Sequence, residues 1–140
     1  MSAKVLLVDD SNTALLMGET VLKKHTSYQV VTAHDGEEAV AKAVAERPDL
    51  ILMDVVMPKM DGFTACREIR KKDGLQGVPI VMVTSRGEPG NVQTGYQSGC
   101  NAYLTKPINA DELLEMVKLF LAGGGSARKG ASAGEGVRLG

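Results

Sequence analysis

Short aliphatic runs alternate with amphipathic stretches along the chain from residue 4 to about residue 121. Most runs are continuously apolar, as in strands that are buried on both faces of a parallel sheet. The stretches between them have the apolar spacing of helices. Repeated strand–helix units of this kind predict an α/β domain in which helices cover a parallel sheet. The five predicted strands are residues 5–8, 28–33, 50–53, 80–83 and 102–104.

The second run alternates apolar and polar residues, which predicts a strand at the edge of the sheet. Helices are predicted at residues 12–24, 37–46, 64–71, 92–98 and from Asn109 to about residue 121. In the first helix Ala14, Met17 and Val21 form the expected buried face. Asn109 and Glu112 have the spacing of a capping box, which marks the start of the last helix.

From Ala122 onward the composition changes to Gly, Ala and Ser with scattered charges. Such a segment buries too little apolar surface to offset the entropy lost on ordering, so residues 122–140 are predicted to be a flexible tail. The chain has 140 residues, about one domain by the usual prior of ~150 residues. We therefore expect one domain over residues 1–121, followed by the tail.

The net charge of −1 gives no overall reason to expect nucleic-acid binding. Only four consecutive aliphatic residues follow the first four positions, far fewer than a signal peptide or a membrane span requires. We therefore expect a cytoplasmic protein with no membrane insertion. Cys66 and Cys100 lack metal-ligand spacing and are interpreted as small buried apolar residues.

Polar side chains stand where the predicted strands end. Asp9 and Asp10 follow the first strand, Asp54 the third and Thr84 the fourth, and Lys106 comes shortly after the fifth. Because ligands of open parallel sheets bind beyond the carboxyl ends of the strands, these side chains are expected to converge on one rim.

Each of these residues also has an ordinary interpretation, such as a helix cap for an aspartate or a solvated surface charge for Lys106. Together they favour a site, because three clustered acids repel one another unless cations compensate them. Oxygen ligands with room for water suit Mg²⁺ better than Ca²⁺, and zinc would need Cys or His ligands. A carboxylate beside Mg²⁺ and a lysine is suited to attack phosphorus, which predicts an aspartyl phosphate.

The sequence resembles the receiver domain of bacterial response regulators, the CheY-like family. The motifs that carry the resemblance are Val-Asp-Asp-Ser at 8–11, Met-Asp-Val-Val-Met-Pro at 53–58, Asp-Gly at 61–62, Val-Thr-Ser at 83–85 and Tyr-Leu-Thr-Lys-Pro at 103–107. The resemblance covers residues 4–121. It implies a stand-alone receiver with the flavodoxin-like fold, a three-layer sandwich whose five parallel strands have the order 2-1-3-4-5.

The resemblance also implies roles for individual residues. Asp54 would be the phosphoacceptor, and it would bind Mg²⁺, or Mn²⁺ in its place, together with Asp9, Asp10 and the backbone carbonyl of Val56. Thr84 would be the switch hydroxyl and Lys106 the cation that pairs with the phosphoryl group.

Further implied roles concern the surroundings of the acceptor. Tyr103 would be an aromatic switch that packs inward when Thr84 moves. Val56 and Arg86 would tune the lifetime of the phosphoryl group, and the Lys106–Pro107 peptide bond is a candidate for the cis form. Gly62 would follow the third strand in a loop, where glycine permits positive φ.

The resemblance implies a single-domain response regulator of a two-component phosphorelay. A sensor histidine kinase or a histidine phosphotransfer protein would donate the phosphoryl group. Phosphorylation would change the face formed by the fourth helix, fifth strand and fifth helix. A downstream protein of chemotaxis, motility or a phosphorelay would bind to this face. We expect a monomer or weak dimer that binds no nucleic acid. It would not be an enzyme, apart from Mg²⁺-dependent self-phosphorylation and slow autodephosphorylation.

Several alternatives remain at this point. The chain could be a receiver fragment of a larger response regulator, with the Gly/Ala/Ser segment as the start of a linker. A flavodoxin-like redox carrier is less consistent with the sequence, because the aspartates occupy the turn where a phosphate-cradling loop is needed and only 4% of residues are aromatic. A phosphatase that works through an aspartyl phosphate would need a second acid at the position of Val56. A binding scaffold without phosphorylation is the third rival.

Overall fold

The computed structural model describes residues 3–84, 97–106, 108–122 and 137–139 of the chain. Five of its strands form a parallel sheet in the order β2-β1-β3-β4-β5, which confirms the predicted fold class. The edge position of β2 confirms the interpretation of its alternating pattern. These strands are β1 (Lys4–Val8), β2 (Gln29–Ala33), β3 (Leu50–Asp54), β4 (Ile80–Thr84) and β5 (Ala102–Thr105).

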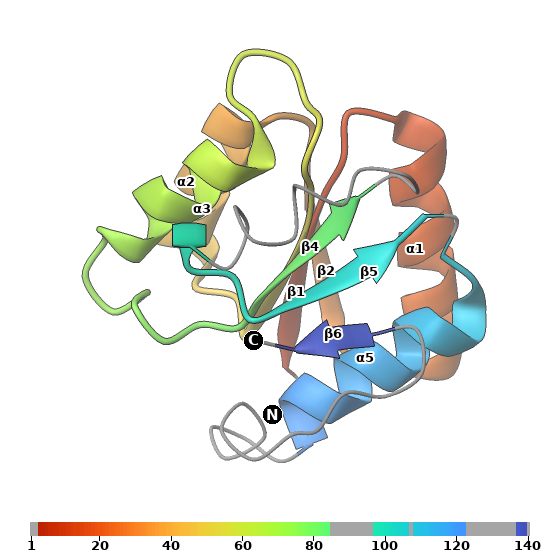
Figure 1. The fold of residues 1–140 in the computed structure, drawn as a ribbon. Helices are drawn as coiled ribbons and strands as arrows, with labels where there is room; N and C mark the ends of the chain where they lie inside the picture. The colour runs from red at the N-terminus through yellow and green to blue at the C-terminus, as the bar shows by residue number, and fades with distance from the viewer. Residues whose placement is uncertain (1–2, 85–96, 107, 123–136, 140) are drawn as a thin grey trace.

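The helices cover both faces of this sheet and make a three-layer structure. The helices are α1 (Asn12–His25), α2 (Gly36–Glu46), α3 (Gly62–Arg70) and α5 (Ala110–Ala122). Figure 1 shows α1 and α5 on one side of the sheet and α2 and α3 on the other. The helix predicted over 92–98 falls largely outside the described residues.

Side chains cap the start of each helix. Asp35 accepts a hydrogen bond from the backbone N–H of Glu38 at 2.8 Å, so the cap of α2 satisfies an N–H that has no partner within the helix. Asn109 accepts from the N–H of Glu112 at 2.8 Å, and the Glu112 carboxylate accepts from the N–H of Asn109 at 3.4 Å. The predicted capping box at α5 is therefore confirmed.

Alternation along the strands divides the buried side chains into two cores. In β1, Leu6 and Val8 belong to the core beneath α2 and α3, whereas Val5 and Leu7 belong to the core beneath α1 and α5. Since successive strand residues point to opposite faces, one short apolar run supplies both cores. The sheet is thus fixed from both sides, and its strand ends are held in register.

The buried face of α1 agrees only in part with the predicted one. Its buried side chains are Leu15 and Leu22, and Gly18 lies against Leu7, whereas Met17 is 60% exposed. Close contact with the sheet at Gly18 sets the rotation of the helix. Met17 is therefore largely exposed, whereas Val21 packs half-buried against the core, as predicted.

A sixth strand lies inside the segment predicted to be a flexible tail. β6 (Val137–Leu139) pairs antiparallel with β5, and α5 itself extends to Ala122. The tail composition did not predict this strand, because three residues carry no periodic signal. Residues 123–136 lie outside the described part of the chain.

Two further expectations concern the cysteines and the membrane. Cys66 and Cys100 are free thiols in the buried core, as predicted. Burial raises the pKa of Cys66 and raises that of Cys100 to about 12, so both are inert as nucleophiles at neutral pH. Among the described helices, none has the length and apolar character needed to cross a membrane.

Candidate phosphorylation and metal site

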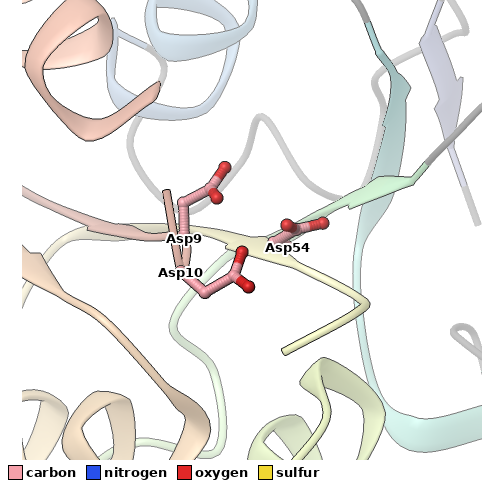
Figure 2. Close-up of side chains that lie close together, drawn as sticks. All are labelled: Asp9, Asp10 and Asp54. Carbon is pink, nitrogen blue, oxygen red and sulfur yellow. The ribbon is translucent and has the colours of Figure 1, made fainter. Parts of the chain in front are cut away.

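Three carboxylates meet at the carboxyl ends of β1 and β3. The register pairs Val8 with Met53, so Asp9 and Asp54 extend from neighbouring strands at the same level. Asp9, Asp10 and Asp54 each place a carboxylate oxygen within 4.8 Å of the others. Figure 2 shows the three side chains gathered around one space. The predicted convergence of these acids is therefore present in the structure.

Lys106 brings a positive charge to the same rim. Its ammonium Nζ lies 3.0 Å from Asp54 Oδ2 and 3.4 Å from Asp9 Oδ2. The backbone N–H of Lys106 donates to the carbonyl of Thr84 at 2.8 Å, which continues the pairing of β4 with β5 and holds the lysine at the strand end. Asp9 is in turn fixed by the N–H of Ser11, which donates to its carboxylate at 2.9 Å.

The charges around Asp54 are only partly balanced. Burial raises the pKa of Asp54, and the neighbouring carboxylates of Asp9 and Asp10 raise it further, although the hydrogen bond from Lys106 opposes them. Burial acts to lower the pKa of Lys106, but the hydrogen bond to Asp54 and the charges of Asp54 and Asp9 raise it above its ordinary value. Among the described residues, one ammonium therefore faces three acids, and a divalent cation would complete the compensation.

The donor set fits a hard divalent cation. The clustered ligand atoms are carboxylate oxygens, and Asp9 and Asp54 are buried whereas Asp10 is exposed. An exposed side leaves room for water and phosphoryl oxygens, which Mg²⁺ usually retains among its ligands. Asp9, Asp10 and Asp54 are thus the residues that could hold Mg²⁺, while the predicted contribution of the Val56 carbonyl stays a prediction.

The chain after β3 turns sharply beneath the site. Gly62 begins α3, and its N–H donates to the carbonyl of Val55 at 2.8 Å. A Cβ at Gly62 would collide with the carbonyl oxygen of Asp54, so glycine is required by close approach of the backbone. The expected positive φ occurs elsewhere in this loop, at Lys59 with φ of 69°. The explanation predicted for Gly62 was therefore wrong.

The two predicted switch residues share one face of the sheet. Thr84 ends β4 with 5% of its surface exposed, and Tyr103 on β5 is 2% exposed. The register pairs Met82 with Tyr103 and Thr84 with Thr105, so Tyr103 is the diagonal neighbour of Thr84. Its ring is packed in the core beneath α2 and α3. The switch role implied for Tyr103 has its ring pack inward when Thr84 moves, and the ring has this inward position here.

The remaining predicted residues flank the site or fall outside the described residues. Val56 is 60% exposed, two positions after Asp54. Arg86 and Pro107 lie outside the described residues, so the tuning role of Arg86 and the cis form of the Lys106–Pro107 bond stay predictions.

Two features near the site were missed by sequence reasoning. A pocket of about 440 Å³ opens between α1 and the start of α5, with Asp9 and Lys106 at its wall and mostly apolar side chains elsewhere. Beside it, Leu16 and Met17 on α1 are 63% and 60% exposed. The run of three apolar residues at 15–17 was the available signal, because one helix face cannot bury all three.

The second missed feature is the contact between α2 and the loop after β3. A Cβ at Gly36 would collide with the carbonyl oxygen of Met60, and the ammonium of Lys59 lies 3.7 Å from the carboxylate of Asp35. The start of α2 therefore supports the loop that follows Asp54. A glycine directly after a helix cap was the only sequence signal.

The fold and this acidic rim are those of a receiver domain, and comparison with known sequences agrees. The family model described as "Response regulator receiver domain" matches residues 5–118. The chain belongs to this family and is a receiver of the two-component type. Membership also sets aside the flavodoxin-like redox carrier.

Named relatives include both short proteins and isolated receiver domains. Protein PilH of Pseudomonas aeruginosa is 38% identical over 121 residues, which cover 86% of this chain and 99% of PilH. The structure of chemotaxis response regulator CheY4 of Vibrio cholerae matches with a TM-score of 0.81 and 39% identity, covering 86% of this chain and 100% of that one.

A third relative is informative about metal binding in the family. The receiver domain of sensor histidine kinase PA1611 from Pseudomonas aeruginosa PAO1 is 34% identical with a TM-score of 0.80, covering 87% of this chain and 99% of that one. That domain was solved with a magnesium ion coordinated in its active site cleft.

Proposed function

We propose that Asp54 accepts a phosphoryl group from a phosphohistidine on a partner protein and that the resulting charge switches the surface of the domain. The observation that carries this proposal is the placement of the Asp54 carboxylate, 3.0 Å from the Lys106 ammonium and beside the carboxylates of Asp9 and Asp10. A buried nucleophilic oxygen thus stands next to an ammonium that can pair with phosphoryl oxygens and next to two carboxylates that could hold a cation for them.

In the transfer step a carboxylate oxygen of Asp54 attacks the phosphorus of the phosphohistidine. A phosphorus–oxygen bond forms, the phosphorus–nitrogen bond breaks, and the released imidazole takes a proton from water. Lys106 pairs with the phosphoryl oxygens, whose negative charge spreads during the transfer. Because the chain only accepts and later loses the group, we propose a phosphoacceptor with slow autodephosphorylation and no separate enzymatic substrate.

Asp9, Asp10 and Asp54 would hold Mg²⁺ at this rim. When bound, the ion would offset negative charge on the phosphoryl oxygens, so that the anionic Asp54 carboxylate could approach the phosphorus. The charge imbalance of three acids against one ammonium supports this assignment. The magnesium-bound PA1611 receiver supports it independently, and Mn²⁺ is the expected substitute.

The phosphoryl group would carry about two negative charges and three acceptor oxygens. Thr84 lies at the end of β4 beside the site and would turn its hydroxyl toward the new acceptor. Since Tyr103 is the diagonal neighbour of Thr84 and already buried, the phosphoryl group would favour the inward state of the ring over other states. The face of β5 and α5 would then bind a downstream protein.

The pathway is proposed at the level of signalling class. A sensor histidine kinase or a histidine phosphotransfer protein would load Asp54 in the cytoplasm, and the output would serve chemotaxis, motility or a phosphorelay. The likeness to chemotaxis response regulator CheY4 supports the first of these. The same site would serve equally in a receiver that forms part of a longer response regulator.

The direct test is labelling by acetyl phosphate with Mg²⁺, followed by intact-mass measurement. We expect one phosphoryl group on the wild type, none on Asp54→Asn, and loss of labelling when EDTA removes the cation. Asp73→Asn serves as the matched control, because Asp73 is exposed and far along the chain from the site. Unchanged labelling of Asp54→Asn would contradict the proposal.

A further inference from the structure

The outer edge of β5 is covered by the last described residues of the chain. Val137 pairs with Leu104, Arg138 with Tyr103 and Leu139 with Ala102 in an antiparallel ladder. Figure 1 shows β6 lying along β5 at the end of the sheet, on the side where α5 packs. The covered strand is the one that carries the predicted switch residue Tyr103.

β5 has the burial pattern of an interior strand. Ala102 and Leu104 are 0% exposed and Tyr103 is 2% exposed, whereas β2 at the opposite edge has mostly half-exposed side chains and a polar start at Gln29. Edge strands of soluble proteins are usually short, charged or covered, because unpaired backbone groups invite further strands. β5 is short but apolar, so without β6 its edge would be an acceptor for an extended peptide.

The cover is short enough to be displaced. Three residues form only a few backbone hydrogen bonds, each contributing about 0.5–1.5 kcal/mol net. A segment of this size would bind weakly as a separate peptide. Its occupancy in the whole chain therefore depends on the tether that keeps it near the sheet.

The linker between α5 and β6 is long enough to allow this pairing. Residues 123–136, fourteen in all, separate the end of α5 at Ala122 from Val137. A Gly/Ser-rich stretch of that length has a root-mean-square reach of about 20 Å. A linker of this length and composition keeps an attached segment at an effective concentration in the millimolar range.

We propose that the outer edge of β5 is a docking site for an extended peptide segment, and that Val137–Leu139 of the same chain occupy it as a displaceable cover. Main-chain hydrogen bonds give such a site its affinity. A partner that adds a strand to this edge must first displace β6. This inference goes beyond the proposed phosphorylation, because the pairing requires no phosphoryl group.

The test is amide hydrogen exchange of β5, measured by NMR on the full chain without a phosphodonor. In the double variant V137P/R138P, neither residue retains an N–H. Because successive strand N–H groups point to opposite sides, this removes at least one donor toward β5 in either arrangement. The matched control V137T/R138K keeps both N–H groups and side chains that strands tolerate.

We expect at least one amide within Ala102–Leu104 to exchange about tenfold faster or more in V137P/R138P, with the control unchanged. A peptide of residues 135–140, Glu-Gly-Val-Arg-Leu-Gly, should restore the protection when added to V137P/R138P at millimolar concentration. Amides of β4 should keep their exchange rates in every sample.

Two results would overturn the inference. Equal exchange of the β5 amides in wild type and V137P/R138P would mean that β6 does not cover the edge in solution. Protection that falls on dilution of the wild type would assign the cover to a second copy of the chain. Because no phosphodonor is present, neither result depends on whether Asp54 accepts a phosphoryl group.

Discussion

Val56 leaves an exposed apolar side chain close to the phosphoacceptor. It lies two positions after Asp54, and 60% of its surface is exposed. An isopropyl group offers neither a donor nor an acceptor, so it cannot orient a water molecule for attack on an aspartyl phosphate. The structure therefore supports the expectation that the phosphoryl group is lost slowly.

We predict that Val56→Asn accelerates phosphate loss from Asp54 about tenfold, equivalent to about 1.4 kcal/mol in the barrier. The amide would hydrogen-bond the attacking water next to the phosphorus. The measurement is the rate at which labelled protein loses phosphate after the phosphodonor is removed. Val56→Thr, whose side chain has nearly the volume of valine, is measured alongside. Equal decay rates for Val56→Asn and wild type would exclude this role.

Gly36, the first residue of α2, lies in close contact with the loop after β3. An added Cβ would meet the carbonyl and side chain of Met60, which belong to the loop between Asp54 and α3. We predict that Gly36→Ala lowers the free energy of unfolding by about 1–3 kcal/mol, because the backbone must shift to admit the methyl group. The shift should also slow acetyl-phosphate labelling.

Gly77→Ala is the control for this prediction, since Gly77 is exposed in a loop and has no positive φ. Denaturant unfolding and the labelling rate would be measured for both variants. A destabilised Gly36→Ala protein that labels at the wild-type rate would show that the contact supports folding but not the site.

Among the described elements, α1 carries two exposed apolar side chains near the site. Leu16 and Met17 are exposed, and Met17 lines a pocket that reaches Asp9 and Lys106. A phosphohistidine must approach Asp54 from the solvent side of this rim. We therefore expect α1 to contact the protein that carries the phosphohistidine.

We predict that the double variant L16S/M17S reduces transfer from a phosphohistidine protein about tenfold or more, while acetyl phosphate still labels Asp54 at the wild-type rate. Stability should change little, because both side chains are largely exposed. Val44→Ser is the control, since Val44 is an exposed apolar residue on α2. A parallel loss of labelling from both donors would indicate damage to the site itself.

The sequence predicts best the strands that are buried on both faces of the sheet, because their residues form continuous apolar runs. Residues 50–53 and 80–83 differ from β3 and β4 by one terminal residue each, because continuous apolar runs have no other stable place in an α/β domain. The buried face of α1 was predicted only in part: Val21 packs against the core, but Met17 is exposed, because contact with Leu7 selects the face that carries Leu15 and Leu22. β6 was missed because its pairing depends on a distant strand.

At the site, the carboxylates and Lys106 were predictable because strand ends of a parallel sheet share one rim. The backbone contacts that support these side chains were not predictable. The contact of Gly36 with Met60 and the close approach at Gly62 depend on how two loops cross, and no local pattern records that crossing. Thus the chemistry of the site follows from sequence, whereas the positioning of its loop requires the structure.

Across the whole molecule, Arg70 ties together three segments at the end of the sheet opposite to Asp54. Its guanidinium donates to the carbonyls of Leu75 and Val78 before β4, and to the carbonyl of Gly99 and the side chain of Asn101 before β5. Asn101 also accepts from the N–H of Ile80 at 2.8 Å. One side chain from α3 therefore fixes the starts of two strands.

We predict that Arg70→Ala lowers the free energy of unfolding by about 3 kcal/mol, because several partly buried carbonyls lose a charged donor at once. Arg70→Lys should recover little of this loss, since one ammonium cannot reproduce the planar fork. Denaturant unfolding measures the effect. Labelling of the folded fraction by acetyl phosphate should stay at the wild-type rate, because the site lies at the other end of the strands.

Arg67→Ala is the matched control on the same helix. Arg67 is exposed and donates to the hydroxyl of Thr64 at 3.2 Å, so its loss should change stability by less than about 0.5 kcal/mol. If Arg70→Ala is no less stable than Arg67→Ala, the starts of β4 and β5 are held by the surrounding apolar packing. If instead Arg70→Ala slows labelling of folded protein, strand position at one end of the sheet controls the site at the other.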